Sequence, residues 1–155
     1  MDGEMNYSMT ENYKKCFKKG LKYQDFVTDI IFEKKAITLS AYSSREYQFT
    51  KGETKQGFEI KFDDSFEKTG NLYIETSEKS NPKNANFIKS GIYRDDNTWI
   101  WLIGNYKELF IFSRKYLRKM HKNKKYREIE TETSTGFLIP KKDVENYCLE
   151  KIIVE

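Results

Sequence analysis

The chain has 155 residues and a formal net charge of +4 at pH 7, from 28 Lys and Arg against 24 Asp and Glu. Aromatic residues make up 15% of it, whereas Gly and Pro number only 8 and 2, so fibrous and disordered classes are excluded and one folded domain is expected. No apolar run approaches the roughly 18 residues of a membrane-spanning helix, so we expect no membrane association.

The histidine and cysteine content excludes several kinds of active site. His121 is the single histidine, and Cys16 and Cys148 lie near opposite ends, so zinc sites with several histidines are excluded. Two isolated cysteines favour a cytoplasmic protein over a disulfide scaffold, with one bridge left open. We therefore expect any chemistry to use carboxylates and lysines.

The first predicted element is a helix that follows a polar arm. Residues 1–19 carry several lysines and predict a flexible or partly helical arm, and residues 20–155 predict a single domain. From Leu21 to Lys35 the apolar residues follow helical spacing, which predicts an amphipathic helix with its apolar face in the core. A short strand is expected around residues 37–39.

Two alternating segments predict a β-hairpin. Phe58, Ile60 and Phe62 alternate with Glu59, Lys61 and Asp63, and a second alternating segment covers residues 72–77. Successive side chains of a strand point to opposite faces, so the charged side chains share one face. The intervening DDSFEKTGN is typical of a hairpin loop.

The second half of the chain adds strands and helices in alternation. NTWIWLIG and KELFIFS are almost continuously apolar, which predicts two central strands joined by a turn after Gly104. Ser113 is placed to cap a helix over RKYLRKMHK, and a strand GFLIP precedes a last helix from about Lys142. Trp99 and Trp101 are expected on one core-facing side. The order predicts an α/β or α+β domain with a mixed sheet of about four to five strands flanked by helices.

The charged face of the hairpin is a candidate metal site. If the two strands pair, Asp63 begins the turn and Glu75 lies on the same face of the neighbouring strand. Two carboxylates from adjacent strands suit Mg²⁺ (or Mn²⁺), which keeps several waters and binds substrate phosphate. The structural alternative is a solvated face with cross-strand Lys–Glu pairs.

A helix, a strand pair carrying an acid and a strand carrying Glu-x-Lys resemble the PD-(D/E)XK nuclease superfamily, which has the restriction-endonuclease-like fold. The text KSGIYRDDNTWIWLIGNYKELFIFSRKYL is similar to the SGI…DxW segment of its phage and restriction-type members. The text G-x-E-I-K-x-D, GNLYIE and EK is also similar to proteins of phages and low-GC Gram-positive bacteria. The resemblance covers residues 20–120, and residues 57–113 carry most of it.

The resemblance implies catalytic roles for four residues. Asp63 becomes the first metal acid and Glu75 the Glu of Glu-x-Lys, with Mg²⁺ bound to both. The third motif position departs, because Ser77 is not lysine. Lys61 is the preferred substitute because it shares a strand face with Asp63, and Lys79 is the alternative.

Other acids extend this set. Glu59 assists, and Glu53 or Glu46 supplies the acid that some members of the superfamily take from the preceding segment. Asp64 competes with Asp63 as the ligand, because a register slip of one residue would exchange them.

A basic segment, RKYLRKMHKNKKYR, spans residues 114–127 with eight Lys and Arg and no acid. Such a run favours binding to DNA phosphates through counterion release, and a solvated helix face is the structural alternative. The predicted DNA contacts are Arg114, Lys115, Arg118, Lys119 and Lys122.

The expected function is a Mg²⁺-dependent deoxyribonuclease of phage or restriction type, acting as a homodimer if both strands of a duplex are cut together. The alternative is an inactive module of the same fold that binds DNA or a protein, favoured by Ser77. A third hypothesis, for a phage-encoded protein, is binding to a host enzyme through a Tyr- and Phe-rich surface.

Overall fold

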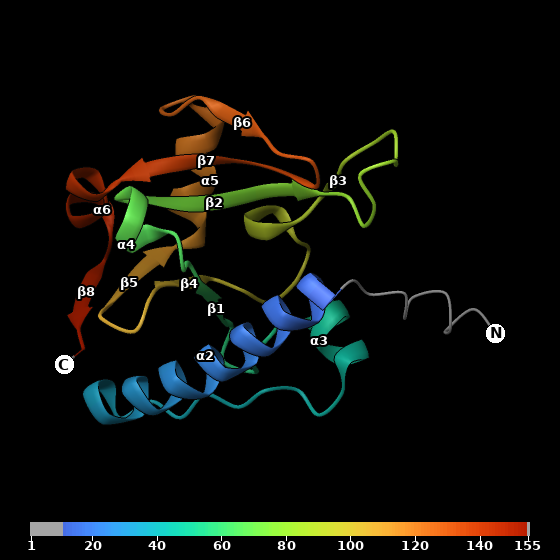
Figure 1. Ribbon diagram of the computed structural model, residues 1–155. Coiled ribbons are helices and arrows are strands. Elements are labelled where there is room, and N and C mark those ends of the chain that lie inside the picture. The colour runs from blue at the N-terminus through green and yellow to red at the C-terminus, as the bar shows by residue number, and fades with distance from the viewer. Residues whose placement is uncertain (1–10, 155) are drawn as a thin grey trace.

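Two four-stranded sheets form the centre of the fold in the computed structural model, which describes residues 11–154 (Figure 1). In the first sheet β1 runs parallel to β4, and the other pairs are antiparallel. Its strands, in spatial order, are β1 (Phe58–Phe62), β4 (Ile100–Gly104), β5 (Glu108–Ser113) and β8 (Glu150–Ile153). The second sheet is antiparallel throughout. Its strands are β3 (Ile88–Lys89), β2 (Asn71–Glu78), β7 (Ser134–Pro140) and β6 (Glu128–Glu130).

Helices surround the sheets, with the long α2 along one side of the first sheet and α5 behind the second (Figure 1). They are α2 (Glu11–Lys35), α3 (Arg45–Lys51), α4 (Phe66–Thr69), the 3-10 turn η1 (Gly91–Tyr93), α5 (Arg114–Lys122) and α6 (Lys141–Tyr147). The predicted α+β class with a mixed, helix-flanked sheet is confirmed. No helix in residues 11–154 has the length and apolar character needed to cross a membrane.

The first sheet separates two apolar cores. On one face Ile60 and Leu102 pack against Tyr23, Val27 and Ile31 of α2. Alternate residues of the same strands point the other way and form a second core with apolar residues of the second sheet and of α5, among them Trp101, Phe110, Leu72, Phe137 and Leu117. Burying each large apolar side chain contributes about 1.5–3 kcal/mol, so the first core holds α2 against the first sheet and the second core fixes the separation of the two sheets.

Several predicted elements are confirmed. The helix over residues 21–35 is the second part of α2, which already includes residues 11–19 of the predicted arm; residues 1–10 of that arm lie outside the described residues. β4 and β5 form the predicted antiparallel pair, and the Ser113 hydroxyl accepts the Tyr116 N–H to cap α5.

The predicted hairpin is wrong. β1 and β2 belong to different sheets, because α4 lies between them and buries Phe66, which is only 2% exposed. β2 pairs with β7 instead. Period-two alternation identifies each strand but does not identify its partner, which explains the error.

Three smaller expectations also fail. Residues 37–39 form no strand, and Ala41 makes only an isolated bridge to Thr54. The last helix ends at Tyr147, so Cys148 lies outside it and Ile152 belongs to β8. Trp101 is buried as predicted, but Trp99 is 59% exposed because it precedes β4.

Candidate active site

The charged face of β1 points into the protein. Glu59 pairs in register with Trp101 of β4, and Lys61 with Ile103, whose side chains belong to the core between the two sheets. Glu59 is therefore only 3% exposed, and Lys61 is half-buried. The alternative of a solvated strand face is wrong for Glu59, so its charge needs a partner.

The Glu59 carboxylate has two partners. Its Oε1 lies 3.1 Å from the Lys61 ammonium, and its Oε2 accepts the Thr98 hydroxyl at 3.3 Å. A buried carboxylate is costly without such partners, so Lys61 is the principal compensation for Glu59.

A second carboxylate, Glu53, enters from the loop after α3. Its Oε2 accepts the Ile60 N–H at 3.3 Å, and its Oε1 is buried without a hydrogen-bond partner among the described residues. Burial, and then the negative charge of Glu59, raise the pKa of Glu53 to about 8. Two neighbouring acids therefore share one local ammonium, an arrangement with unsatisfied capacity for a cation or a donor.

The same acids act on Lys61 in the opposite direction. Burial alone would lower the pKa of the Lys61 ammonium. The charges of Glu59, Glu53 and Glu75 outweigh burial and raise that pKa. Lys61 therefore stays charged at neutral pH and serves as a fixed cation rather than as a base.

Glu75 brings a third carboxylate from the second sheet. Its Oε2 accepts the Ser90 hydroxyl at 2.9 Å, and burial raises its pKa although Lys61 and this hydrogen bond oppose the change. The 3-10 turn η1 presses on β2 here: Gly91 has φ of +54°, and a Cβ on it would lie 2.1 Å from the Glu75 carbonyl oxygen. Only glycine fits at this contact.

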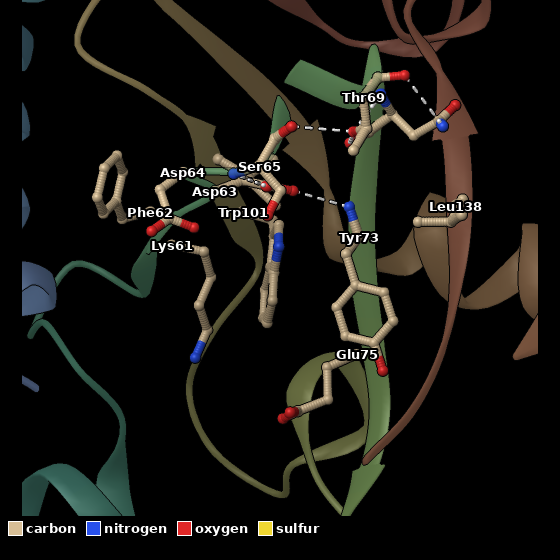
Figure 2. A pocket seen from close by; sticks show the side chains of 12 residues that line it. Lys61, Phe62, Asp63, Asp64, Ser65, Thr69, Tyr73, Glu75, Trp101 and Leu138 are labelled. Carbon is tan, nitrogen blue, oxygen red and sulfur yellow. Dashed lines mark hydrogen bonds between the residues drawn. The ribbon is translucent and has the colours of Figure 1, made fainter. Parts of the chain in front are cut away.

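Lys61 and Glu75 line a pocket of about 460 Å³, whereas Glu53 and Glu59 reach it only through their interaction with Lys61. Figure 2 shows Lys61 from β1 and Glu75 from β2 extending along the same side of the pocket, with Trp101 of β4 between them. The Trp101 Nε1–H is buried without a hydrogen-bond acceptor among the described residues. The pocket therefore offers the Lys61 ammonium and the Glu75 carboxylate, with Trp101 as part of its wall.

Asp63 lines the same pocket but is held by backbone amides. Its Oδ2 accepts the Tyr73 N–H at 2.9 Å and its Oδ1 the Ser65 N–H at 3.2 Å, and Figure 2 shows the carboxylate turned toward Tyr73. Burial raises its pKa despite these bonds. Asp63 thus ties the end of β1 to the beginning of β2, and its predicted competitor Asp64 is exposed and faces Lys19 at 3.6 Å.

The remaining candidates lie elsewhere. Ser77 bonds to the Thr135 hydroxyl, and the register of β2 with β7 shifts between Glu75 and Ser77, a bulge that breaks their alternation. Lys79 donates to the Asn84 carbonyl at 3.0 Å. Glu46 is exposed in the first turn of α3.

The fit to a divalent metal rests on few protein ligands. Within residues 11–154 no three His, Cys, Asp or Glu side chains gather into a metal-binding group. Mg²⁺ needs only one or two carboxylates when waters and phosphate complete its shell. The unpartnered Oε1 of Glu53, beside the carboxylate of Glu59, fits that requirement better than Asp63, whose oxygens both accept amides.

One signal in the sequence points to this cluster directly. Glu59-Ile60-Lys61 itself has the Glu-x-Lys spacing that was assigned to Glu75 and Ser77. The structure joins that pair to Glu53, which had been only an alternative. The residues next to Glu53 in the sequence do not identify it as a site residue, because its position depends on a contact with the more distant Ile60 N–H.

The predicted DNA-contacting residues divide into two groups. Arg114 is 9% exposed and donates to Asp96 Oδ1 at 2.8 Å, and Arg118 donates to the Ile92 carbonyl at 2.5 Å. These arginines hold the loop that follows η1. Lys115, Lys119 and Lys122 are exposed on α5.

Comparison with protein-family models, curated proteins and solved structures finds no match for this chain.

Proposed function

We propose that the protein is a Mg²⁺-dependent nuclease that hydrolyses DNA phosphodiester bonds at the pocket beside Glu53, Glu59, Lys61 and Glu75. The observation that carries the proposal is the buried Glu53 carboxylate: its Oε1 has no hydrogen-bond partner among residues 11–154, and the negative charge of Glu59 lies close to it. Strongly perturbed acids next to a pocket are characteristic of functional sites.

The resemblance to the PD-(D/E)XK superfamily supports the same chemistry. Its Glu-x-Lys spacing falls on Glu59 and Lys61, with Glu53 as the preceding acid. In this assignment Glu53 and Glu59 would hold the ion, and Glu75 faces the pocket as an additional acceptor. Asp63 is the residue that the assignment removes from the original metal pair.

The side chains supply the positions that hydrolysis needs. A bound Mg²⁺ would lower the pKa of a coordinated water and offset the charge of the phosphate. Lys61 donates to a phosphate oxygen or orients the water, and its ion pair with Glu59 keeps the ammonium in place.

The alternative is an inactive module that binds DNA or a protein partner. It is favoured by the ion pair of the candidate site, because Lys61 and Glu59 already neutralise each other at 3.1 Å without an ion. The motif lysine is also missing at Ser77. In this alternative the cluster is a buried ion pair that fixes the relative position of the two sheets.

The proposed setting is the cytoplasm, where Cys16 and Cys148 would stay as the free thiols that the structure shows. The proposed partner is DNA, held by exposed lysines of α5. A homodimer is proposed only for paired cleavage of a duplex, and a host protein for the inactive alternative.

Cleavage of supercoiled plasmid and branched DNA in Mg²⁺ or Mn²⁺ tests the proposal, with Glu59→Gln and Glu53→Gln as site variants. Both should lose about a hundredfold or more in rate, because each removes a charge that binds the ion. Glu145→Gln is the matched control, since Glu145 is exposed on α6 and pairs with Lys151 at 2.6 Å, and neither residue lines the pocket.

Metal binding is measured separately, as the rise in melting temperature with Mn²⁺. If the wild-type protein neither cuts DNA nor melts at a higher temperature with metal, the nuclease proposal fails and the inactive binding module replaces it. Cutting that survives in Glu59→Gln would place the active site elsewhere.

A further inference from the structure

A second cavity, of about 960 Å³, lies along α5. Every charged side chain that lines it is cationic: Arg114, Lys115, Arg118, Lys119 and Lys122. Because Arg114 is bonded to the loop after η1 and Arg118 to η1 itself, the lysines are the cations available to a ligand. We call this cavity the α5 groove.

The three lysines of the α5 groove form one row. Lys115, Lys119 and Lys122 are spaced by four and three residues, which places them on one face of the helix. Among residues 11–154 no carboxylate lies within ion-pair distance of any of them. A row of unpaired ammonium groups along a groove matches a chain of phosphates.

Trp99 lines the same groove, 59% exposed but held firmly. Its Nε1–H donates to the Gln56 carbonyl at 2.9 Å, and its ring stands edge-on to Phe58 with 5.7 Å between the ring centres. Gly57 makes this packing possible, since a Cβ there would lie 2.5 Å from the indole. The exposed ring is therefore pre-ordered and loses little entropy when a ligand stacks on it.

From this combination we infer that the α5 groove binds single-stranded DNA, with an unpaired base stacked on Trp99 and successive phosphates on Lys115, Lys119 and Lys122. An indole face pairs with a base only when that base is free of its own stack, so a single strand fits better than a duplex. The choice of DNA rests on the proposed function, whereas the single-stranded character rests on Trp99.

Thr98 separates the groove from the candidate active site by a single side chain. Thr98 lines the groove and donates its hydroxyl hydrogen bond to Glu59, which contacts Lys61 on the pocket side. A strand in the groove would therefore pass one residue away from the carboxylate cluster. The binding step itself needs no metal.

Fluorescence anisotropy with labelled oligothymidine in EDTA tests the inference, because the chelator prevents cleavage. Trp99→Ala should weaken binding about tenfold or more, the loss of one stacked base, whereas Trp99→Phe should retain most of the affinity. Both variants are first checked by their melting curves, and Trp99→Phe keeps the packing on Phe58 if the alanine variant unfolds.

Salt dependence tests the lysines. The triple Lys→Gln variant of the α5 groove should reduce the slope of log affinity against log salt by about 2, as expected for three phosphates on a single strand. The matched control replaces three exposed lysines of α2, Lys14, Lys18 and Lys22, and should leave the slope unchanged.

Three outcomes would overturn the inference. The first is an unchanged affinity for oligothymidine in Trp99→Ala, and the second is a loss of affinity for duplex DNA in this variant as large as its loss for oligothymidine. The third is tighter binding of oligouridine than of oligothymidine by the wild-type protein. The nuclease proposal fails independently of these. If the wild-type protein binds the oligonucleotide but never cuts DNA, the inference about the α5 groove stands and the nuclease proposal fails. If the wild-type protein cuts DNA but Trp99→Ala binds the oligonucleotide as tightly as the wild type, the nuclease proposal stands and the inference about the groove fails.

Discussion

The two faces of the first sheet have opposite chemistry although they share the same strands. On the α2 side Ile60 and Leu102 pack in a cluster of apolar and aromatic side chains. On the other side Glu59 and Lys61 lie beside Trp101, in the space between the two sheets. One face is built for stability alone, and the other contains charges that water would stabilise better.

This difference separates what holds the protein together from what it can do. Burial of the apolar face contributes to folding in proportion to its area. Burial of Glu53 and Glu59 costs free energy, which is why the pKa of Glu53 lies near 8. Acids buried at such a cost near a pocket favour a functional role for that pocket. The apolar core on the α2 side gives these acids a rigid support.

The largest expected effect is on the apolar face. Leu102→Ala should lower the free energy of unfolding by about 2–5 kcal/mol, because Leu102 is fully buried between β4 and α2. Urea unfolding measures it, with the exposed Leu21→Ala as a control near zero. The Mn²⁺ response of the folded variant should persist, and its loss would show that the two faces are not independent.

On the charged face, Lys61→Met should destabilise by about 1–2 kcal/mol, less than for a fully buried pair because Lys61 reaches solvent. The change leaves Glu59 without its cation, so adding Glu59→Gln should recover part of the loss. A double-mutant cycle in urea measures this coupling. Strictly additive losses would mean that the two residues act separately.

The acid pair predicts a pH dependence of stability. The pKa of Glu53 is raised to about 8 from 4.5, so its protonated form contributes stability that is complete below pH 4.5 and is lost as the pH rises through 8. Glu53→Gln keeps the neutral form, and its advantage in melting temperature should grow from about pH 5 to pH 9 by several degrees.

Stabilisation by a bound metal should change over the same pH range, but it should increase with pH where the stability of the metal-free protein decreases. An ion must displace the Glu53 proton, so the stabilisation by Mn²⁺ should increase with pH and level off above 8. A Mn²⁺ effect that is the same at all these pH values would exclude Glu53 as a ligand.

The smallest expected effect separates the two assignments of Asp63. Asp63→Asn keeps one acceptor for the backbone amides and should cost about 1 kcal/mol or less, without changing the Mn²⁺ response. Thermal melting with and without Mn²⁺ measures both quantities. A lost metal response in Asp63→Asn would restore the original pair of Asp63 and Glu75.

Local patterns in the sequence predict the elements that depend on nearby residues. The stripe of α2 follows from helical spacing, and β4 and β5 follow from two apolar runs around Gly104. Ser113 identifies the beginning of α5 because its hydroxyl bonds three residues ahead. The same short range explains why α4, only four residues long, was read as a loop.

Long-range pairing could not be predicted in the same way. The sequence places Glu59 and Lys61 on one face, but only the second sheet brings Glu75 toward them. Nothing near Glu53 shows that its carboxylate will bond to the Ile60 amide. The exposure of Trp99 depends on Gly57, which lies 42 positions earlier and lets the ring lie against the backbone.

The position of Glu75 in the site depends on Gly91, a residue without a side chain, because Gly91 contacts the Glu75 carbonyl. A methyl group at position 91 would push the backbone of β2 and shift the Glu75 carboxylate, although no charged residue has been replaced. A random screen for lost function should therefore recover Gly91 together with the acids, and compensating changes should appear on the η1 side of this contact.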